Sequence, residues 1–218
     1  MKQKVLFGNY DSFEDFSLIL SRYTLEEPEA KTEYIDIEGA DGELDITEYF
    51  GFVPFKSRKA TFEFQTKLKG QDFYDMFETI SNAINGKRLN IIIYRDEYFY
   101  LDGRIKMNEY KSNEKIGSVI IEATCQPYKM EVRETLYTFT LTGGTIEATL
   151  TNLKKYVSPK VDVVATAGNN VNITFNNETF SLSNGSWTIP ELVLKEGNNI
   201  ITLSGVGTIT FSYRKGKL

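Results

Sequence analysis

The sequence predicts a mostly β protein of the α+β class, with an N-terminal β-rich domain that carries one helix and a C-terminal antiparallel β-sandwich. Three observations support this prediction. The 218 residues include 15 Phe and 13 Tyr, and aromatic and β-branched residues favour strands. Only one segment has apolar residues at helical spacing. Residues 131–218 contain short strand-like runs separated by Asn and Gly turns, which is typical of a sandwich.

The two parts differ in charge. Residues 1–130 carry 23 acidic and 17 basic side chains, whereas residues 131–218 carry 7 and 8. The second part is rich in Thr, Asn, Val and Gly. A change of composition indicates a domain boundary, so we expect domains at 1–130 and 131–218.

In the first domain, alternating or apolar runs predict strands at residues 16–20, 32–37, 60–65, 89–94, 97–101, 104–110 and 118–124. The helix is expected over residues 71–85, where one apolar stripe is formed by Phe73, Met76, Phe77, Ile80 and Ile84. Asn85-Gly86 is a typical helix stop.

In the second domain, strands are predicted at residues 136–141, 160–165, 171–175, 179–182, 186–189, 199–203 and 208–213. Trp187 alternates with Ile189 along one of them, so the two side chains share a face. We expect Trp187 to be buried between the two sheets. The alternative is an exposed platform on which a sugar stacks.

The composition argues against an enzyme, a metal site or a cofactor. The chain has no histidine, which excludes His-activated nucleophiles and His-ligated zinc. Its single cysteine, Cys125, ends an apolar alternating run and is expected to be buried and inert. No phosphate-binding glycine loop is present. The net charge of −5 argues against a sequence-independent grip on nucleic acid.

No targeting segment or membrane span is predicted, because the longest strongly apolar run is Ile91–Ile93. We therefore expect folding in a reducing cytoplasm.

The segment with the largest excess of negative charge is residues 26–48, with ten carboxylates and one lysine. Paired carboxylates could serve a glycosidase, but nothing fixes a pair at the needed separation. An EF-hand loop fails because Ile37 and Gly39 occupy ligand positions.

One group of residues, between positions 39 and 64, forms a more specific motif than any described above. A glycine-paired acidic turn and a short strand are followed by a basic residue that opens an aromatic strand, at Gly39, Gly42, Leu44, Asp45, Thr47, Arg58, Phe62 and Phe64. This pattern resembles the distal tail proteins of long-tailed (siphovirus-type) bacteriophages and related prophages. The helix at 71–85, the Cys-x-Pro-Tyr junction at residues 125–128 and the closing strand with its basic tail at 207–218 agree with it in order.

The resemblance implies a galectin-like C-terminal domain and a structural role in the phage tail tip, or baseplate, without catalysis. It implies a homohexameric ring of first domains that joins the tail tube protein to the tail hub or fibre proteins. The protein would be located in the virion, after assembly in the bacterial host cytoplasm. DNA would pass the ring without being bound, and no membrane partner is implied. The alternative function is a carbohydrate-binding accessory protein that acts through the C-terminal sandwich, where weak carbohydrate binding is expected.

Within this resemblance, Glu38, Asp41, Glu43 and Asp45 are candidates for lining the ring opening, where negative charge repels DNA. The alternative is that these carboxylates are solvated on the outer rim, or that they pair with Lys56, Arg58 and Lys59 across a subunit contact. The sequence leaves both interpretations open.

Overall fold

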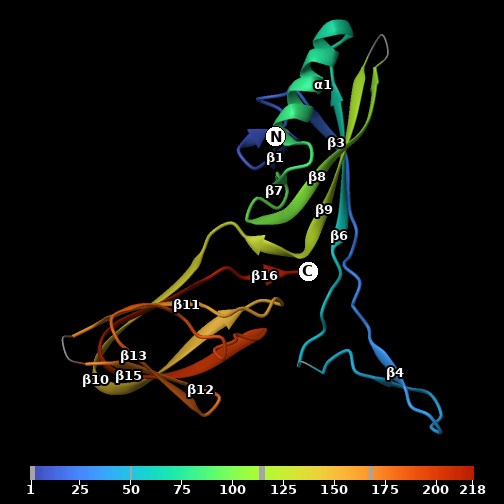
Figure 1. Ribbon diagram of the computed structural model, residues 1–218. Coiled ribbons are helices and arrows are strands. Elements are labelled where there is room, and N and C mark those ends of the chain that lie inside the picture. Colours follow the sequence, from blue (N-terminus) through green and yellow to red (C-terminus); the bar gives the residue numbers. More distant parts are fainter. Residues whose placement is uncertain (1–2, 50, 113–115, 167–168) are drawn as a thin grey trace. The chain divides into compact units, whose positions relative to one another are not determined.

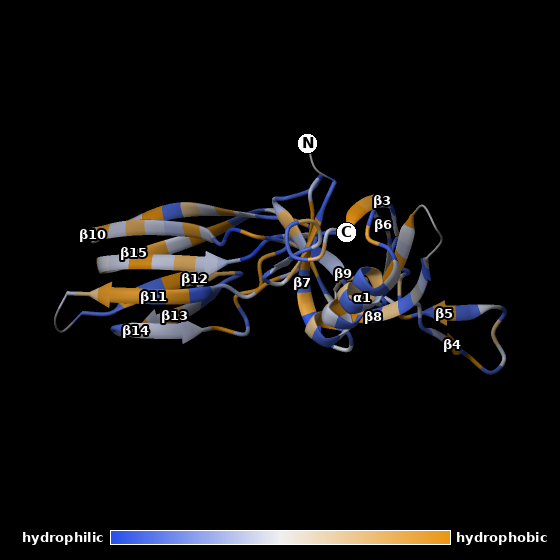
Figure 2. Ribbon diagram, turned by 90° about the horizontal axis from the view of Figure 1, so that it is seen from above, coloured by the Kyte–Doolittle hydropathy of each residue, from blue (hydrophilic) through white to orange (hydrophobic). Residues whose placement is uncertain are grey.

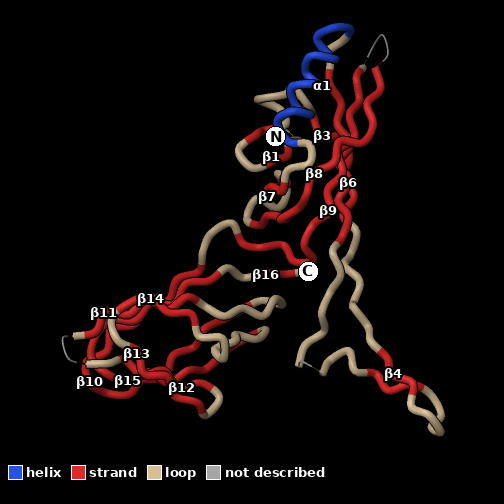
Figure 3. The backbone as a smooth tube through the Cα atoms, in the orientation of Figure 1, coloured by secondary structure: helices blue, strands red, loops and turns tan. Residues whose placement is uncertain are grey.

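The computed structural model describes residues 3–49, 51–112, 116–166 and 169–218. It divides into two compact units, Met1–Lys129 and Met130–Leu218. The predicted fold class is confirmed, because strands dominate and every strand pair with a described register is antiparallel. Figure 3 shows the small share of helix among the strands.

The first unit is built on one sheet with the strand order β2-β1-β7-β8-β9-β6-β3. Its strands are β1 (Val5–Phe7), β2 (Tyr10–Asp11), β3 (Ile19–Leu25), β6 (Arg58–Thr66), β7 (Arg88–Ile93), β8 (Phe99–Ser112) and β9 (Gly117–Glu131). Two predicted strands, 97–101 and 104–110, are one strand in the structure. The predicted strand 16–20 begins only at Ile19, because Ser17 has a φ of 56° and turns the chain.

Helix α1 (Gly70–Ile84) confirms the predicted helix to within one residue at each end. It buries Phe73, Met76, Ile80 and Ile84 in the core of the first unit, while Phe77 is half-buried. Figure 2 shows its hydrophobic and hydrophilic residues alternating around the helix. The helix approaches β9 closely, since a Cβ on Gly117 would lie 2.5 Å from the Phe73 ring.

Between β3 and β6 the chain leaves the sheet. Residues 26–57, hereafter the arm, run outward, form the hairpin of β4 (Tyr34–Asp36) and β5 (Glu43–Asp45), and return (Figure 1). The predicted strand at 32–37 therefore exists, but it pairs only within this two-stranded hairpin and takes no part in the main sheet.

The second unit contains β10 (Thr135–Asn152), β11 (Lys160–Ala165), β12 (Val171–Phe175), β13 (Glu178–Leu182), β14 (Gly185–Thr188), β15 (Gly197–Tyr213) and β16 (Gly216–Lys217). β10 pairs with β15 from Thr135 to Thr142 and again from Thr145 to Asn152. The other edge of β15 pairs first with β12 and then, beyond Gly205, with β11. The predicted strands 199–203 and 208–213 are thus two halves of one strand.

The glycines of β15 allow its two partners to come this close. Gly205 and Gly207 have φ values of 117° and 148°, and a Cβ on either would lie 2.5 Å from a backbone oxygen of Asn170 or Val164. On β10 the register shifts between Thr142 and Thr145. The two halves of this long hairpin face each other, because residues of β11 and β12 share one core. The result is a sandwich made from one continuous sheet.

The expected burial of Trp187 is wrong. Trp187 lies opposite the fully buried Val161, on the core side of the sheet, yet its side chain is 39% exposed. β14 is the last strand of the order β13-β12-β15-β11-β14, so no further described strand of this sheet lies beyond it. Ile189, just beyond the strand, is buried as expected.

Candidate interaction surface

The tip of the arm is shaped by the two motif glycines. Gly39 and Gly42 have φ values of 83° and 81°, in the left-handed region that glycine adopts at no steric cost. The Ala40 N–H donates to the Ile37 carbonyl at 3.1 Å, which closes the turn. The sequence motif therefore encodes the reversal between β4 and β5.

Asp45 and Thr47 hold the base of the same hairpin. The Thr47 N–H donates to Asp45 Oδ1 at 2.8 Å, and the Glu33 N–H donates to Thr47 Oγ1 at 3.0 Å. Hydrogen bonds from the Thr47 side chain and backbone lower the pKa of the Asp45 carboxyl. Through these hydrogen bonds the two residues stabilise the arm itself.

A short ladder joins the arm to the main sheet. The Glu26 N–H donates to the Lys59 carbonyl at 3.0 Å and the Lys56 N–H donates to the Glu29 carbonyl at 2.8 Å. Further out, Ala30 forms an isolated bridge with Phe55. Two hydrogen-bonded chains are stiffer than a single loop, so the arm is a structural extension of β3 and β6.

The arm has no core of its own. None of its described side chains is buried, and large apolar residues are exposed on it: Tyr34 (52%), Ile35 (46%), Ile37 (45%), Leu44 (50%), Tyr49 (78%) and Phe52 (42%). Ile35 and Leu44 are cross-strand partners, so they share one face of the hairpin. Clustered exposed apolar residues mark an interaction surface.

The opposite face of the hairpin is acidic. Asp36 lies directly across from Glu43 in the register, and like charges in such a pair destabilise a hairpin. Over residues 26–57 the sequence has ten carboxylates and two lysines, whereas residues 1–25 and 58–129 have 13 acidic and 15 basic side chains. The arm therefore concentrates the negative charge of the first unit.

The structure brings Gly39, Gly42, Asp45 and Thr47 together on the arm and places Arg58 elsewhere. Arg58 begins β6, is 3% exposed, and has no hydrogen-bond partner at Nε or Nη2. Burial lowers the pKa of its guanidinium, and only the charges of Glu27 and Cys125 oppose this. Glu38, Asp41 and Glu43 are exposed near the hairpin tip.

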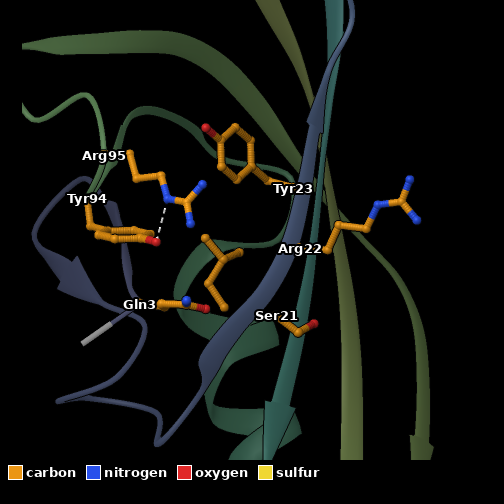
Figure 4. Close-up of a pocket in the computed structure, with 7 residues that line it drawn as sticks. Gln3, Ser21, Arg22, Tyr23, Tyr94 and Arg95 are labelled. Carbon is orange, nitrogen blue, oxygen red and sulfur yellow. Dashed lines mark hydrogen bonds between the residues drawn. The ribbon is translucent and has the colours of Figure 1, made fainter. Parts of the chain in front are cut away.

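A small pocket lies beside the edge strand β3 and was not anticipated from the sequence. Its volume is about 210 Å³, and its lining includes Gln3, Leu20, Tyr23, Tyr94 and Arg95. Arg95 donates from Nε to the Tyr94 hydroxyl at 2.6 Å and points into the pocket, whereas Arg22 points away from it (Figure 4). No pattern in the sequence joins these positions, because three separate segments meet here.

The described residues contain no group of three or more side chains suited to a metal ion. Cys125 is buried as expected, and burial raises the pKa of its thiol to about 11. No helix in the described part of the chain has the length and apolarity needed to cross a membrane. Surface features with chemical character in the described part of the chain include the arm, the β3 pocket and the exposed Trp187.

No protein-family profile matches this chain, and no curated protein is similar to it in sequence. A solved structure is similar in fold: the crystal structure of the SPP1 Dit protein (gp 19.1), described as a paradigm of the hub adsorption apparatus in phages that infect Gram-positive bacteria. The similarity covers 99% of this chain and 99% of that chain, with a TM-score of 0.69 and 12% sequence identity. Both units, in their order along the chain, therefore share the fold of the SPP1 Dit protein.

Proposed function

We propose that this chain is a structural component of a phage tail tip, and that it forms a hexameric ring joining the tail tube to the tail hub or receptor-binding apparatus. The observation that carries the proposal is the fold similarity to the SPP1 Dit protein over 99% of both chains. It agrees with the sequence motif on the arm, which resembles the same family. The protein acts in the virion, after assembly in the host cytoplasm.

The arm supports an assembling role. A two-stranded hairpin is marginal in water by itself, and this one exposes an apolar face and a repelling carboxylate pair. Both costs fall when a neighbouring protein covers the hairpin. On these grounds we assign Glu38, Asp41, Glu43 and Asp45 to a subunit contact rather than to the ring opening, since exposed Ile and Leu do not suit a water-filled channel.

Electron micrographs of purified tails test this function. Tagging the chain at its C-terminus should add density at the tail tip, in a ring with sixfold symmetry. The mass of the isolated protein in solution gives a second measurement. A hexamer supports the ring, whereas a monomer is compatible with weak subunit contacts that form only when the protein meets the tube. Absence of the tag from tails, or a threefold ring at its position, would contradict the proposal.

A carbohydrate-binding function of the second unit is the second candidate, and the exposure of Trp187 favours it. The indole N–H donates to the Ser183 carbonyl at 3.0 Å, which fixes the ring at the sheet edge with 39% of its surface accessible. Such a ring can stack on a sugar. Because Trp187 is the sole tryptophan, its fluorescence reports binding directly.

Titration with host cell-wall polysaccharide should then shift the emission of Trp187, and Trp187→Ala should abolish the heat of binding measured by calorimetry. Trp187→Phe keeps an aromatic face and serves as the matched control. Unchanged emission at saturating polysaccharide would remove this candidate and leave the tail-tip proposal intact.

A further inference from the structure

The pocket beside β3 is suited to a carboxylate. Arg95 is exposed, and its guanidinium is oriented by the Nε bond to the Tyr94 hydroxyl and by stacking 5.5 Å from the Tyr94 ring centroid. Within the described residues, Arg95 forms no ion pair. A guanidinium held by Nε keeps its terminal nitrogens free for bidentate pairing with carboxylates.

The strand next to this pocket has an open edge. Among the described strands, β3 is the last of the sheet and its partner is β6. On its outer side the Leu20 N–H donates to the Gln3 carbonyl at 2.9 Å, and from Arg22 to Leu25 no described backbone group pairs there. An open edge with unpaired N–H and C=O groups is a template for a further strand.

The same protein has an extended segment with the complementary charge. Asp36 and Glu43 are a cross-strand pair, so their Cβ atoms lie about 5 Å apart and their carboxylates are on the same face. A guanidinium inserted between them would neutralise their repulsion and bond to both. The apolar pair Ile35 and Leu44 lies on the opposite face of the hairpin, so this contact is made by the acidic face.

The arm of one copy cannot supply this contact to its own pocket. The ladder at its base directs it away from the sheet, and Asp36 lies 11 residues beyond Leu25, about 36 Å along an extended chain. Figure 1 shows the arm leaving the sheet at the end opposite to the N-terminus of α1. The complementary charges of Arg95 and the acidic hairpin therefore favour a second copy of the chain as the partner that binds at the pocket.

We propose that the acidic hairpin of one copy docks on the β3 edge of a second copy, where Arg95 binds Asp36 and Glu43. The inference rests on the proposed ring and names its subunit contact. Arm and pocket are different surfaces, so the contact is head-to-tail, and such contacts close into rings when the rotation allows.

A charge swap measured by sedimentation at millimolar concentration tests the contact. Arg95→Glu should weaken self-association about tenfold to a hundredfold, the loss expected for charged hydrogen bonds of ~1.5–3 kcal/mol. Asp36→Lys with Glu43→Lys should weaken it similarly. The triple variant that combines both changes should recover most of the association.

Lys87→Glu is the matched control, because it makes the same change of charge at an exposed position that lies neither in the pocket lining nor on β3. It should leave association within about twofold of the unchanged protein. Far-ultraviolet circular dichroism checks that all variants fold. The inference is overturned if the unchanged protein stays monomeric, if Lys87→Glu acts like Arg95→Glu, or if the triple variant shows no recovery. A sixfold ring in tails alongside any of these results would leave the proposed function standing.

Discussion

The sole tryptophan of the chain lies at the edge of its sheet, and this position sets its energetic role. Phe211 lies on the neighbouring part of the same core face and is fully buried. Both aromatic residues belong to alternating runs, and both face inward. They differ in their distance from the edge of the sheet. Trp187 is on the edge strand β14, whereas Phe211 is on β15, which has a strand on each side.

Trp187→Ala should lower the free energy of unfolding of the second unit by about 1–2 kcal/mol, for partial burial and one hydrogen bond. Phe211→Ala should cost about 3–5 kcal/mol, as large core truncations do. Hydrogen exchange of the β11 amides measures both. Equal losses for the two variants would show that Trp187 is part of the core.

Arg58 is a buried cation without complete hydrogen bonding. An unsatisfied buried group costs about 1–3 kcal/mol, more when it is charged. Arg58→Met, which keeps the chain length, should leave the stability of the first unit unchanged or raise it, as measured by hydrogen exchange of β6. The control is Lys59→Met, which removes the partly exposed Lys59–Glu122 ion pair at 2.7 Å and should cost about 1 kcal/mol or less. A loss of several kcal/mol for Arg58→Met would reveal a strong anionic partner.

The burial of Cys125 makes the stability of the first unit depend on pH. The pKa of its thiol rises from 9.0 to about 11 through burial. Since the folded pKa exceeds the unfolded one, this thiol contributes stability that is complete below pH 9 and is lost as pH rises toward 11. At pH 8 iodoacetamide should therefore modify Cys125 only in proportion to the unfolded fraction across a urea titration. Rapid modification without urea would contradict its burial.

At the scale of elements, the long hairpin of β10 and β15 shows how glycines turn one sheet into two layers. The backbones of β12 and β11 come within contact of β15 at Gly205 and Gly207, where any side chain would collide. The alternation along both long strands is visible in Figure 2. The close approach lets a single hydrogen-bonded sheet enclose a core.

Gly205→Ala combines a φ of 117° with a Cβ that would lie 2.5 Å from the Asn170 oxygen. Strain of this kind costs about 1–3 kcal/mol, so the urea midpoint of the second unit should fall clearly. Gly144→Ala, on the facing strand with nothing within 4 Å, should change stability by less than about 1 kcal/mol. Trp187 fluorescence reports both transitions, and similar midpoints would refute the close packing.

At the scale of the whole chain, variants on the arm distinguish the two interpretations of the acidic segment, a subunit contact and the lining of the ring opening. Asp41→Lys with Glu43→Lys should prevent incorporation into tails if these residues lie in a subunit contact, which is the outcome we expect. If they line the ring opening, tails should form normally and eject DNA more slowly, with the delay shrinking at high salt. Asp72→Lys with Glu78→Lys makes the same charge change on exposed positions of α1, outside the arm, and should leave incorporation unaffected.

The sequence by itself determined the mostly β class, the helix at α1 and the burial of Cys125, because apolar periodicity and side-chain type are local properties. It also located the turn at Gly39 and Gly42, where only glycine adopts the backbone without cost. Tertiary structure decided that residues 32–37 belong to an arm outside the main sheet and that Trp187 is exposed. It also assembled the Arg95 pocket from three segments. Alternation tells which face a side chain occupies, but strand order decides what lies beyond it, and that order depends on pairings between distant residues.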